Sequence, residues 1–205
     1  MEAATSTGPE RGLAGDKAQR IVAAMRASVA ERGVAASTFD HVARAAGVSR
    51  GLLHYYFGTK ERLLAEVVRH DCDVRLALLD AALAPAQTAE DVIDALVRSL
   101  GETVKDVPAF VGGLFELFTV ARRNQELAAE LAELTRRTRR RLARVLAAKA
   151  DEGVLRLGAE PEAVATVLFA LADGFALRML SEPDADHGPA ISAGVQAARV
   201  LLQPA

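Results

Sequence analysis

The segment Thr38–Phe57 reads TFDHVARAAGVSRGLLHYYF, and it decides the expected fold of the N-terminal part of this chain. Four of its apolar residues recur at the i, i+3, i+4, i+7 spacing of a helix with one buried side: Phe39, Val42, Ala43 and Ala46. Gly47 then ends this helix, and Ser49 can cap a second one with Leu53 and Phe57 on its buried side. The pattern predicts a helix-turn-helix, whose second helix can enter a DNA major groove.

The side chains left on the outer side of the second helix suit contacts with DNA. Arg50 lies at its N-terminal end, where an arginine can pair bidentately with guanine, and Gly51 lets the backbone approach closely. His54 and Tyr55 offer donors and flat surfaces to phosphate, sugar or thymine methyl groups. Lys60 begins the next helix, where an ammonium group and free backbone N–H groups together form a typical anion site.

The rest of the chain predicts an all-α fold of about nine helices, with a small N-terminal bundle and a larger C-terminal one. Aromatic residues make up only 4% of the chain and there is no Trp, which disfavours sheet. No segment shows sustained period-2 alternation, so we predict essentially no strand. After a disordered leader over residues 1–15, the remaining helices are expected at 16–32, 60–83, 88–106, 109–123, 124–152, 160–181 and 189–203.

Charge is distributed unevenly along the 205 residues, although the formal net charge is only −2. From Asp16 to His70 there are nine Lys or Arg residues and five Asp or Glu residues. From Asp71 onward there are 15 Lys or Arg residues and 20 Asp or Glu residues. A basic N-terminal part joined to an acidic remainder is compatible with polyanion binding at one end.

Cysteine content and apolar runs indicate a cytoplasmic protein without a membrane span. The single cysteine, Cys72, cannot form an internal disulfide, which favours a reducing compartment. Residues 1–15 lack the basic start and apolar run of a signal peptide. The most apolar stretch, Ala163–Leu180, contains Asp173 and Arg178, and is too short and too charged for a membrane span.

Two other function classes stay open beside DNA binding: a small serine hydrolase, and a helical ligand-binding module with no DNA role. The segment Gly47–Gly51 (GVSRG) matches the G-x-S-x-G nucleophile elbow. That elbow needs a strand before the serine, whereas the residues before Ser49 have helical spacing. We therefore expect Ser49 to be a helix cap and the protein not to be an enzyme.

Three further features are interpreted as structural. The basic run of Arg136–Arg144 is typical of a solvated helix face paired with neighbouring glutamates, although a second polyanion site is an alternative. His70–Asp73 holds metal-ligand residue types, but consecutive helix positions point in different directions, so no metal site is expected. No P-loop, dinucleotide fingerprint or HExxH motif is present, so we expect no cofactor.

Residues 16–70 resemble the DNA-binding domain of the TetR family of transcriptional regulators, and the resemblance covers about a quarter of the chain. It is carried by these segments, in the family's order and spacing: Ile21–Ala27, Glu31–Gly33, Thr38, Val42-Ala43, Ala45–Ser49 and Leu53–Glu61. The resemblance assigns residues 71–205 to a C-terminal effector-binding and dimerisation domain. Family members often carry tyrosine where this chain has His54.

The resemblance implies a homodimer that reads a palindromic or near-palindromic DNA operator and is released from it, as a repressor, by a small apolar effector. By position, it places Thr38, Tyr56 and Lys60 at phosphates, and Arg50, Gly51 and His54 at bases. The effector is not identified by the sequence.

The C-terminal region offers candidates for the effector pocket and the dimer interface. The pocket candidates are apolar residues of the helices at 109–123 and 160–181: Phe110, Leu114, Phe115, Phe118, Phe169 and Met179. The helix at 160–181 resembles a dimerisation helix, with these interface candidates: Val164, Leu168, Leu171 and Phe175. Ordinary core packing is the alternative for both sets.

Overall fold

The structure is a computed structural model that describes residues 15–105 and 107–205, without the side chains of residues 103–110. The expected disordered leader lies outside the described residues except for Gly15. The described part contains nine helices and one two-stranded antiparallel sheet, which confirms the all-α class.

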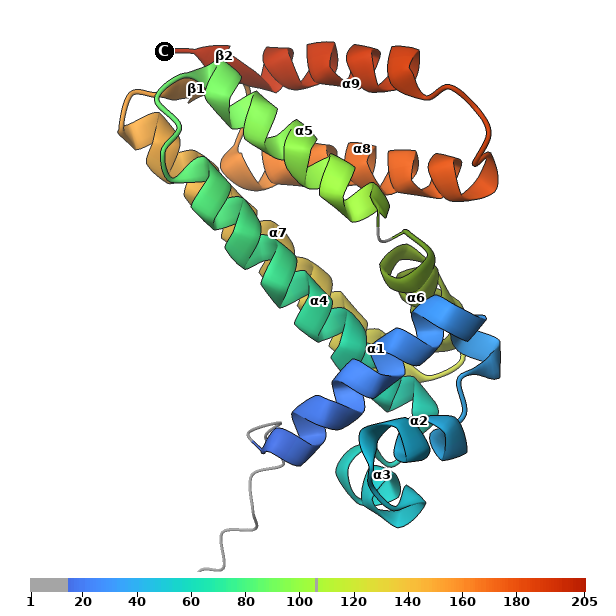
Figure 1. Cartoon of the computed structure of the whole chain (residues 1–205). Coiled ribbons are helices and arrows are strands. Elements are labelled where there is room, and N and C mark those ends of the chain that lie inside the picture. The colour runs from blue at the N-terminus through green and yellow to red at the C-terminus, as the bar shows by residue number, and fades with distance from the viewer. Residues whose placement is uncertain (1–14, 106) are drawn as a thin grey trace, which may run out of the picture.

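The helices agree with the expected ranges to within a few residues (Figure 1). They are α1 (Asp16–Ala36), α2 (Phe39–Ala46), α3 (Arg50–Phe57), α4 (Lys60–Leu83), α5 (Ala89–Lys105), α6 (Val107–Ala121), α7 (Gln125–Asp151), α8 (Pro161–Ser181) and α9 (Gly188–Leu201). The strands, β1 (Leu155–Leu157) and β2 (Leu202–Pro204), were not expected. Three residues are too few to show an alternating pattern, and Leu155 and Leu202 anchor the pair by being buried.

The N-terminal core is built by α1 to α4 and completed by helices from farther along the chain. Ile21 and Met25 of α1 are fully buried together with Leu53 of α3 and Leu63 of α4. Leu117 of α6, with the first turns of α7, belongs to the same cluster. Packing therefore crosses the expected domain boundary near residue 70, and the division at that point stays a prediction.

The second core joins the end of α4 to α5, the end of α7, α8 and the two strands. A buried lysine closes the connection between α4 and α5: Lys149 Nζ donates to the carbonyl oxygens of Ala84 and Ala86, both at 3.2 Å. It also lies 2.9 Å from the Glu152 carboxylate. All three ammonium donors are therefore used, as burial of a charge requires.

Two long helices connect the two cores. Helices α4 and α7 pack along each other between the two ends of the molecule (Figure 1).

By length and apolar composition alone, α8 could cross a membrane. Here it packs against α7 and α9, and several of its apolar side chains stay exposed. That no segment enters a membrane stays a prediction.

Candidate DNA-binding and ligand-binding sites

Local chain chemistry forms the turn between α2 and α3. Gly47 adopts a left-handed conformation (φ 65°, ψ 38°) that ends α2, and Val48 N–H donates to the Ala43 carbonyl at 3.0 Å. The Ser49 hydroxyl then accepts from Leu52 N–H at 3.3 Å and so caps α3. Since Leu53 and Phe57 are buried, the opposite side of α3 faces solvent. The predicted helix-turn-helix geometry is present.

Arg50 lies at the exposed start of α3, as expected for a residue that reads bases. Its side chain is 61% exposed. The Nη1 group donates to both carboxylate oxygens of Asp40, each at 3.3 Å, so an acidic residue of α2 holds the guanidinium. This pair was not anticipated, because the two residues are ten positions apart and meet only across the turn. Gly51 is exposed, and the nearest atom to a Cβ built there is Ser49 Oγ at 3.9 Å.

His54 and Tyr55 lie on the same exposed side of α3, but their surroundings differ. His54 Nδ1 lies 3.0 Å from the Gly58 carbonyl oxygen, and its ring meets Phe39 edge-on at 4.8 Å. Because a carbonyl only accepts, Nδ1 is the donor, which leaves Nε2 as the outward atom. Tyr55 is 69% exposed and contacts Tyr56 edge-on. Tyr55 is therefore the freer of the two side chains.

Of the three residues expected at phosphates, Thr38 and Lys60 also contact helix ends. The Thr38 hydroxyl accepts from His41 N–H at 3.3 Å and caps α2, while its own proton remains available as a donor. Lys60 Nζ donates to the Ala35 carbonyl at 3.2 Å, at the end of α1, which leaves two further ammonium donors. Tyr56 is half-buried against the N-terminal core. Thr38 and Lys60 flank α3, and Tyr56 lies in its last turn.

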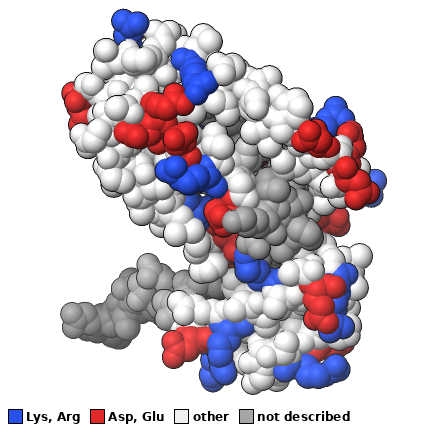
Figure 2. All heavy atoms as spheres, turned by 45° about the horizontal axis from the view of Figure 1, so that its top comes forward, with Lys and Arg blue, Asp and Glu red and all other residues white. Residues whose placement is uncertain are grey.

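The surface of the N-terminal helices carries charges of both signs. In Figure 2 blue lysines and arginines lie on the lower part of the molecule together with red acidic groups. No continuous basic surface is visible on the face that this view shows.

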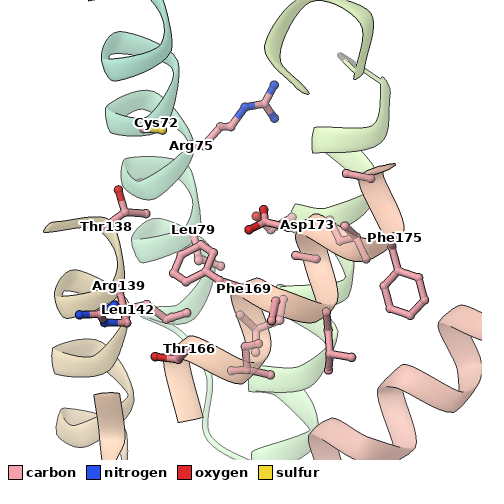
Figure 3. Close-up of a pocket in the computed structure, with 18 of the residues that line it drawn as sticks. Cys72, Arg75, Leu79, Thr138, Arg139, Leu142, Thr166, Phe169, Asp173 and Phe175 are labelled. Carbon is pink, nitrogen blue, oxygen red and sulfur yellow. The ribbon is translucent and has the colours of Figure 1, made fainter. Parts of the chain in front are cut away.

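A cavity of about 470 Å³ lies between the N-terminal core and the second core, and it is lined by α4 to α9 (Figure 3). Four of the expected pocket residues line it: Leu114, Phe115, Phe118 and Phe169. Met179 is half-buried and is not among the lining residues, and the side chain of Phe110 lies outside the described part. The volume lies within the range of small-molecule sites, about 300–1,000 Å³.

The cavity also holds polar groups that the sequence analysis did not assign to it. Arg75 of α4, Thr138 and Arg139 of α7, and Asp173 of α8 line the otherwise apolar space. Partial desolvation raises the pKa of the Asp173 carboxyl above its ordinary value, although the residue is exposed overall. Asp173 was visible in the sequence as an acidic residue within an apolar helix, and that was the only available signal.

Comparison with protein families agrees with both regions. The model for bacterial regulatory proteins of the tetR family matches residues 21–67, and the model for the C-terminal region of BetI-type transcriptional repressors matches residues 85–195. The second match alone covers more than half of the chain.

The chain belongs to the TetR family.

Individual relatives support this assignment. The HTH-type transcriptional regulator BetI of Rhizobium meliloti (strain 1021) is 30% identical over 134 residues, which is 65% of this chain and 66% of that protein. The match thus spans just under two thirds of this curated relative. A TetR-family transcriptional regulator from Rhodococcus sp. superposes with a TM-score of 0.71 at 25% identity, covering 91% of this chain and 98% of that one. A transcriptional regulator from Streptomyces coelicolor A3(2) gives 0.67 at 26%, covering 90% and 97%.

TetR-family regulators are non-enzymatic DNA-binding proteins, so the hydrolase interpretation is wrong for this chain. The structure gives the same answer, because a helix, α2, precedes Ser49, and its hydroxyl caps α3. A nucleophile elbow needs a strand at that point.

The structure places the four expected interface residues of this TetR-family chain inside its own fold. Val164 is fully buried, and Leu168 packs against the second core. Leu171 and Phe175 line the cavity, and a Cβ built at Gly194 of α9 would lie 2.8 Å from the Phe175 ring. These four residues therefore lie on the inward side of α8, and their role in an interface stays a prediction.

A different side of α8 is exposed and apolar. Its residues recur at alternating spacings of four and three: Ala163, Val167, Ala170, Gly174 and Leu177. The first four each precede one of the expected interface residues by one position. Val167 and Leu177 are 44% and 43% exposed. The sequence analysis did not single out this side, because α8 is apolar nearly all round and the bulkier residues were chosen.

The features interpreted as structural have partners in the fold. Arg137 pairs with Asp73 at 2.6 Å, and Arg141 Nε donates to Asp80 at 2.8 Å, so these arginines of α7 hold α4. Asp71 accepts from Arg26 Nε at 2.9 and 3.1 Å. The acidic residues on either side of Cys72 are thus occupied by arginines.

Proposed function

We propose that this chain is a dimeric, ligand-responsive transcriptional repressor that acts on a palindromic or near-palindromic operator in the cytoplasm. The observation that carries the proposal is the exposed start of α3, with Arg50 outward, in a fold whose other end holds a ligand-sized cavity. The match of residues 85–195 to the C-terminal region of BetI-type repressors supports repression over activation.

In the proposed complex, α3 lies in the major groove. Arg50 and His54 Nε2 face base edges, Gly51 admits the backbone, and Tyr55 contacts the sugar-phosphate chain or a thymine methyl group. The hydroxyls of Thr38 and Tyr56 and the two free donors of Lys60 bind phosphates on either side.

The exposed apolar side of α8 supports an interface with a second copy of the chain. Regulators of the TetR family act as dimers, and such an interface would cover Val167 and Leu177. The small residues Ala163, Ala170 and Gly174 on the same side allow close helix approach. Two copies would present two α3 helices to half-sites about 34–36 Å apart, one turn of DNA.

Two helices connect the cavity to α3. Helix α4 begins at Lys60 beside α3 and carries Leu76 and Leu79 into the cavity wall. Helix α6 contributes Phe115 and Phe118 to the cavity and packs against α1 with its other side. A ligand that favours one placement of α4 and α6 thereby shifts the populations of DNA-binding conformers. A coupling of about 1–3 kcal/mol changes operator affinity by about 5- to 150-fold.

The test is selection of bound sequences from random duplexes, followed by footprinting of the full chain on the selected DNA. We expect a two-fold site with half-sites one or more helical turns apart, and release of that site by members of a small-molecule library. If the protein is a folded dimer and the selection recovers only random sequences, the result would favour the alternative of a ligand-binding module without a DNA role. If a site is selected but no ligand releases the protein from it, the DNA-binding role stands and the proposed effector response is refuted.

A further inference from the structure

The cavity reaches the molecular surface beside the middle turns of α8. Three residues of this helix both line the cavity and are exposed: Thr166, Ala170 and Asp173. Spacings of four and three residues place them in one strip along the helix. Figure 3 shows Thr166 and Asp173 on the same side of α8, opposite to Phe175, which points toward α9. A single copy of the chain therefore leaves this part of the cavity wall open to solvent.

This strip lies directly beside the exposed apolar side of α8, and Ala170 belongs to both. Each residue advances by about 100° around a helix axis, so the middle of the strip lies about 50° from the middle of the apolar side. A helix packed on another covers an arc of about 100°. A helix seated on the apolar side would therefore cover Ala170 and reach the edge of the opening at Thr166 and Asp173.

The occupant that fits the apolar side is a second copy of this chain. Regulators of the TetR family act as dimers, and Val167 and Leu177 on this side are exposed apolar residues of the kind that a stable interface covers. A two-fold contact uses the same surface on both copies. Each copy would therefore cover the opening of the other.

We propose that the ligand cavity is completed only in the dimer, because the second copy forms the missing wall over Thr166, Ala170 and Asp173. The inference rests on the proposed function in two respects, that the dimer forms through α8 and that this cavity takes the ligand. It adds that ligand binding and dimerisation stabilise each other.

Thermodynamic linkage gives the size of the effect. A ligand should bind the completed cavity more tightly than the open cavity of a monomer, because more of its apolar surface leaves water. A coupling of ordinary size corresponds to a factor of about 5 to 150 in affinity. Since a dimer holds two cavities, a saturating ligand must lower the dissociation constant of the dimer by the square of that factor.

The experiment is fluorescence-detected sedimentation of the full chain, labelled at its N-terminus, with and without N-phenyl-1-naphthylamine. This uncharged aromatic probe suits a cavity of about 470 Å³ whose lining is mostly aliphatic and aromatic. Its own fluorescence, titrated at protein concentrations above and below the dimer dissociation constant, gives its affinity for each state. We expect affinity about 5- to 150-fold higher for the dimer, and tighter dimers by the square of the measured factor.

Two variants assign the effect to the second copy. Leu177→Glu should give monomers that bind the probe as weakly as diluted wild-type protein, although Leu177 does not line the cavity. Leu78→Glu is the matched control, because Leu78 is an exposed leucine of α4 that also does not line the cavity, and it should change neither dimerisation nor probe affinity. Circular dichroism checks folding. If Leu177→Glu does not fold, Val167→Glu on the same side replaces it.

The outcomes separate this inference from the proposed function. Equal or tighter binding of the probe by the monomer overturns it, because the opening is then not covered by the second copy. A dimer that does not bind the probe, or whose dissociation constant the probe leaves unchanged, also overturns it. In each of these cases the dimer and its DNA binding stand. A wild-type protein that sediments as a monomer with and without the probe removes the dimer of the proposed function together with this inference.

Discussion

Replacement of Arg50 by alanine tests the assignment of α3 as the reading helix. The Arg50–Asp40 pair joins two largely exposed side chains at 3.3 Å, so it contributes less than about 1 kcal/mol to stability. Unfolding should therefore change little. A bidentate contact between arginine and guanine contributes about 1–3 kcal/mol, so affinity for the selected operator should fall by about 5- to 150-fold.

The assay is fluorescence anisotropy with the selected duplex and with duplexes altered at single positions. Arg50→Ala should also relax base preference at one position of each half-site, because the arginine reads that base pair. Asp40→Asn is the matched control. Removal of a negative charge beside the phosphates should raise affinity for every duplex and leave base preference intact.

Two results would refute the reasoning. Operator affinity of Arg50→Ala equal to that of the wild-type protein would remove Arg50 from the interface. A loss of affinity that is uniform over all duplexes would make Arg50 a phosphate contact, and base reading would then have to come from His54 or Tyr55.

Four further predictions concern other parts of the molecule. Lys60→Ala should weaken binding to all duplexes alike and flatten the salt dependence of affinity, and a changed base preference would contradict the phosphate role. Leu177→Glu should give folded monomers in sedimentation, whereas an unchanged dimer would exclude that side of α8. Lys149→Met should lower the free energy of unfolding in urea by about 2–4 kcal/mol, because two carbonyls lose a charged donor, and an unchanged midpoint would contradict this. Burial, followed by the charges of Asp73 and Asp71, raises the pKa of the Cys72 thiol to about 12. Iodoacetamide at pH 8 should therefore label Cys72 far more slowly in the native protein than in the urea-unfolded protein, and equal labelling rates would refute the burial of the thiol. Because the thiol ionises more readily in the unfolded chain, the free energy of unfolding should also fall as the pH rises above about 9.

Local signals were sufficient for the helices and for the turn that positions α3. Gly47, Ser49 and Thr59 act through neighbours within five residues, so their effects can be inferred from sequence. The pair of Arg50 with Asp40 depends on the angle at which α2 and α3 cross. That angle is set by packing of Phe39, Leu53 and Phe57, and spacing does not give it.

The C-terminal sites were less accessible to sequence reasoning because α8 is apolar on nearly every side. Periodicity identifies one buried side only when the opposite side is polar. On α8 the sets beginning at Ala163 and Val164 have the same spacing, and only the position of α7 and α9 shows which one faces inward.

Helix α6 restricts how this regulator can be retuned as a biosensor. Leu114 and Phe118 line the cavity, while Leu117 and Ala121 of the same helix pack into the N-terminal core. Mutation of the first pair to admit a new compound therefore also disturbs the packing of the second pair. Libraries aimed at altered specificity should therefore vary α5 and α8 and keep α6 constant. Variants selected in this way should respond to new compounds with their basal expression level retained.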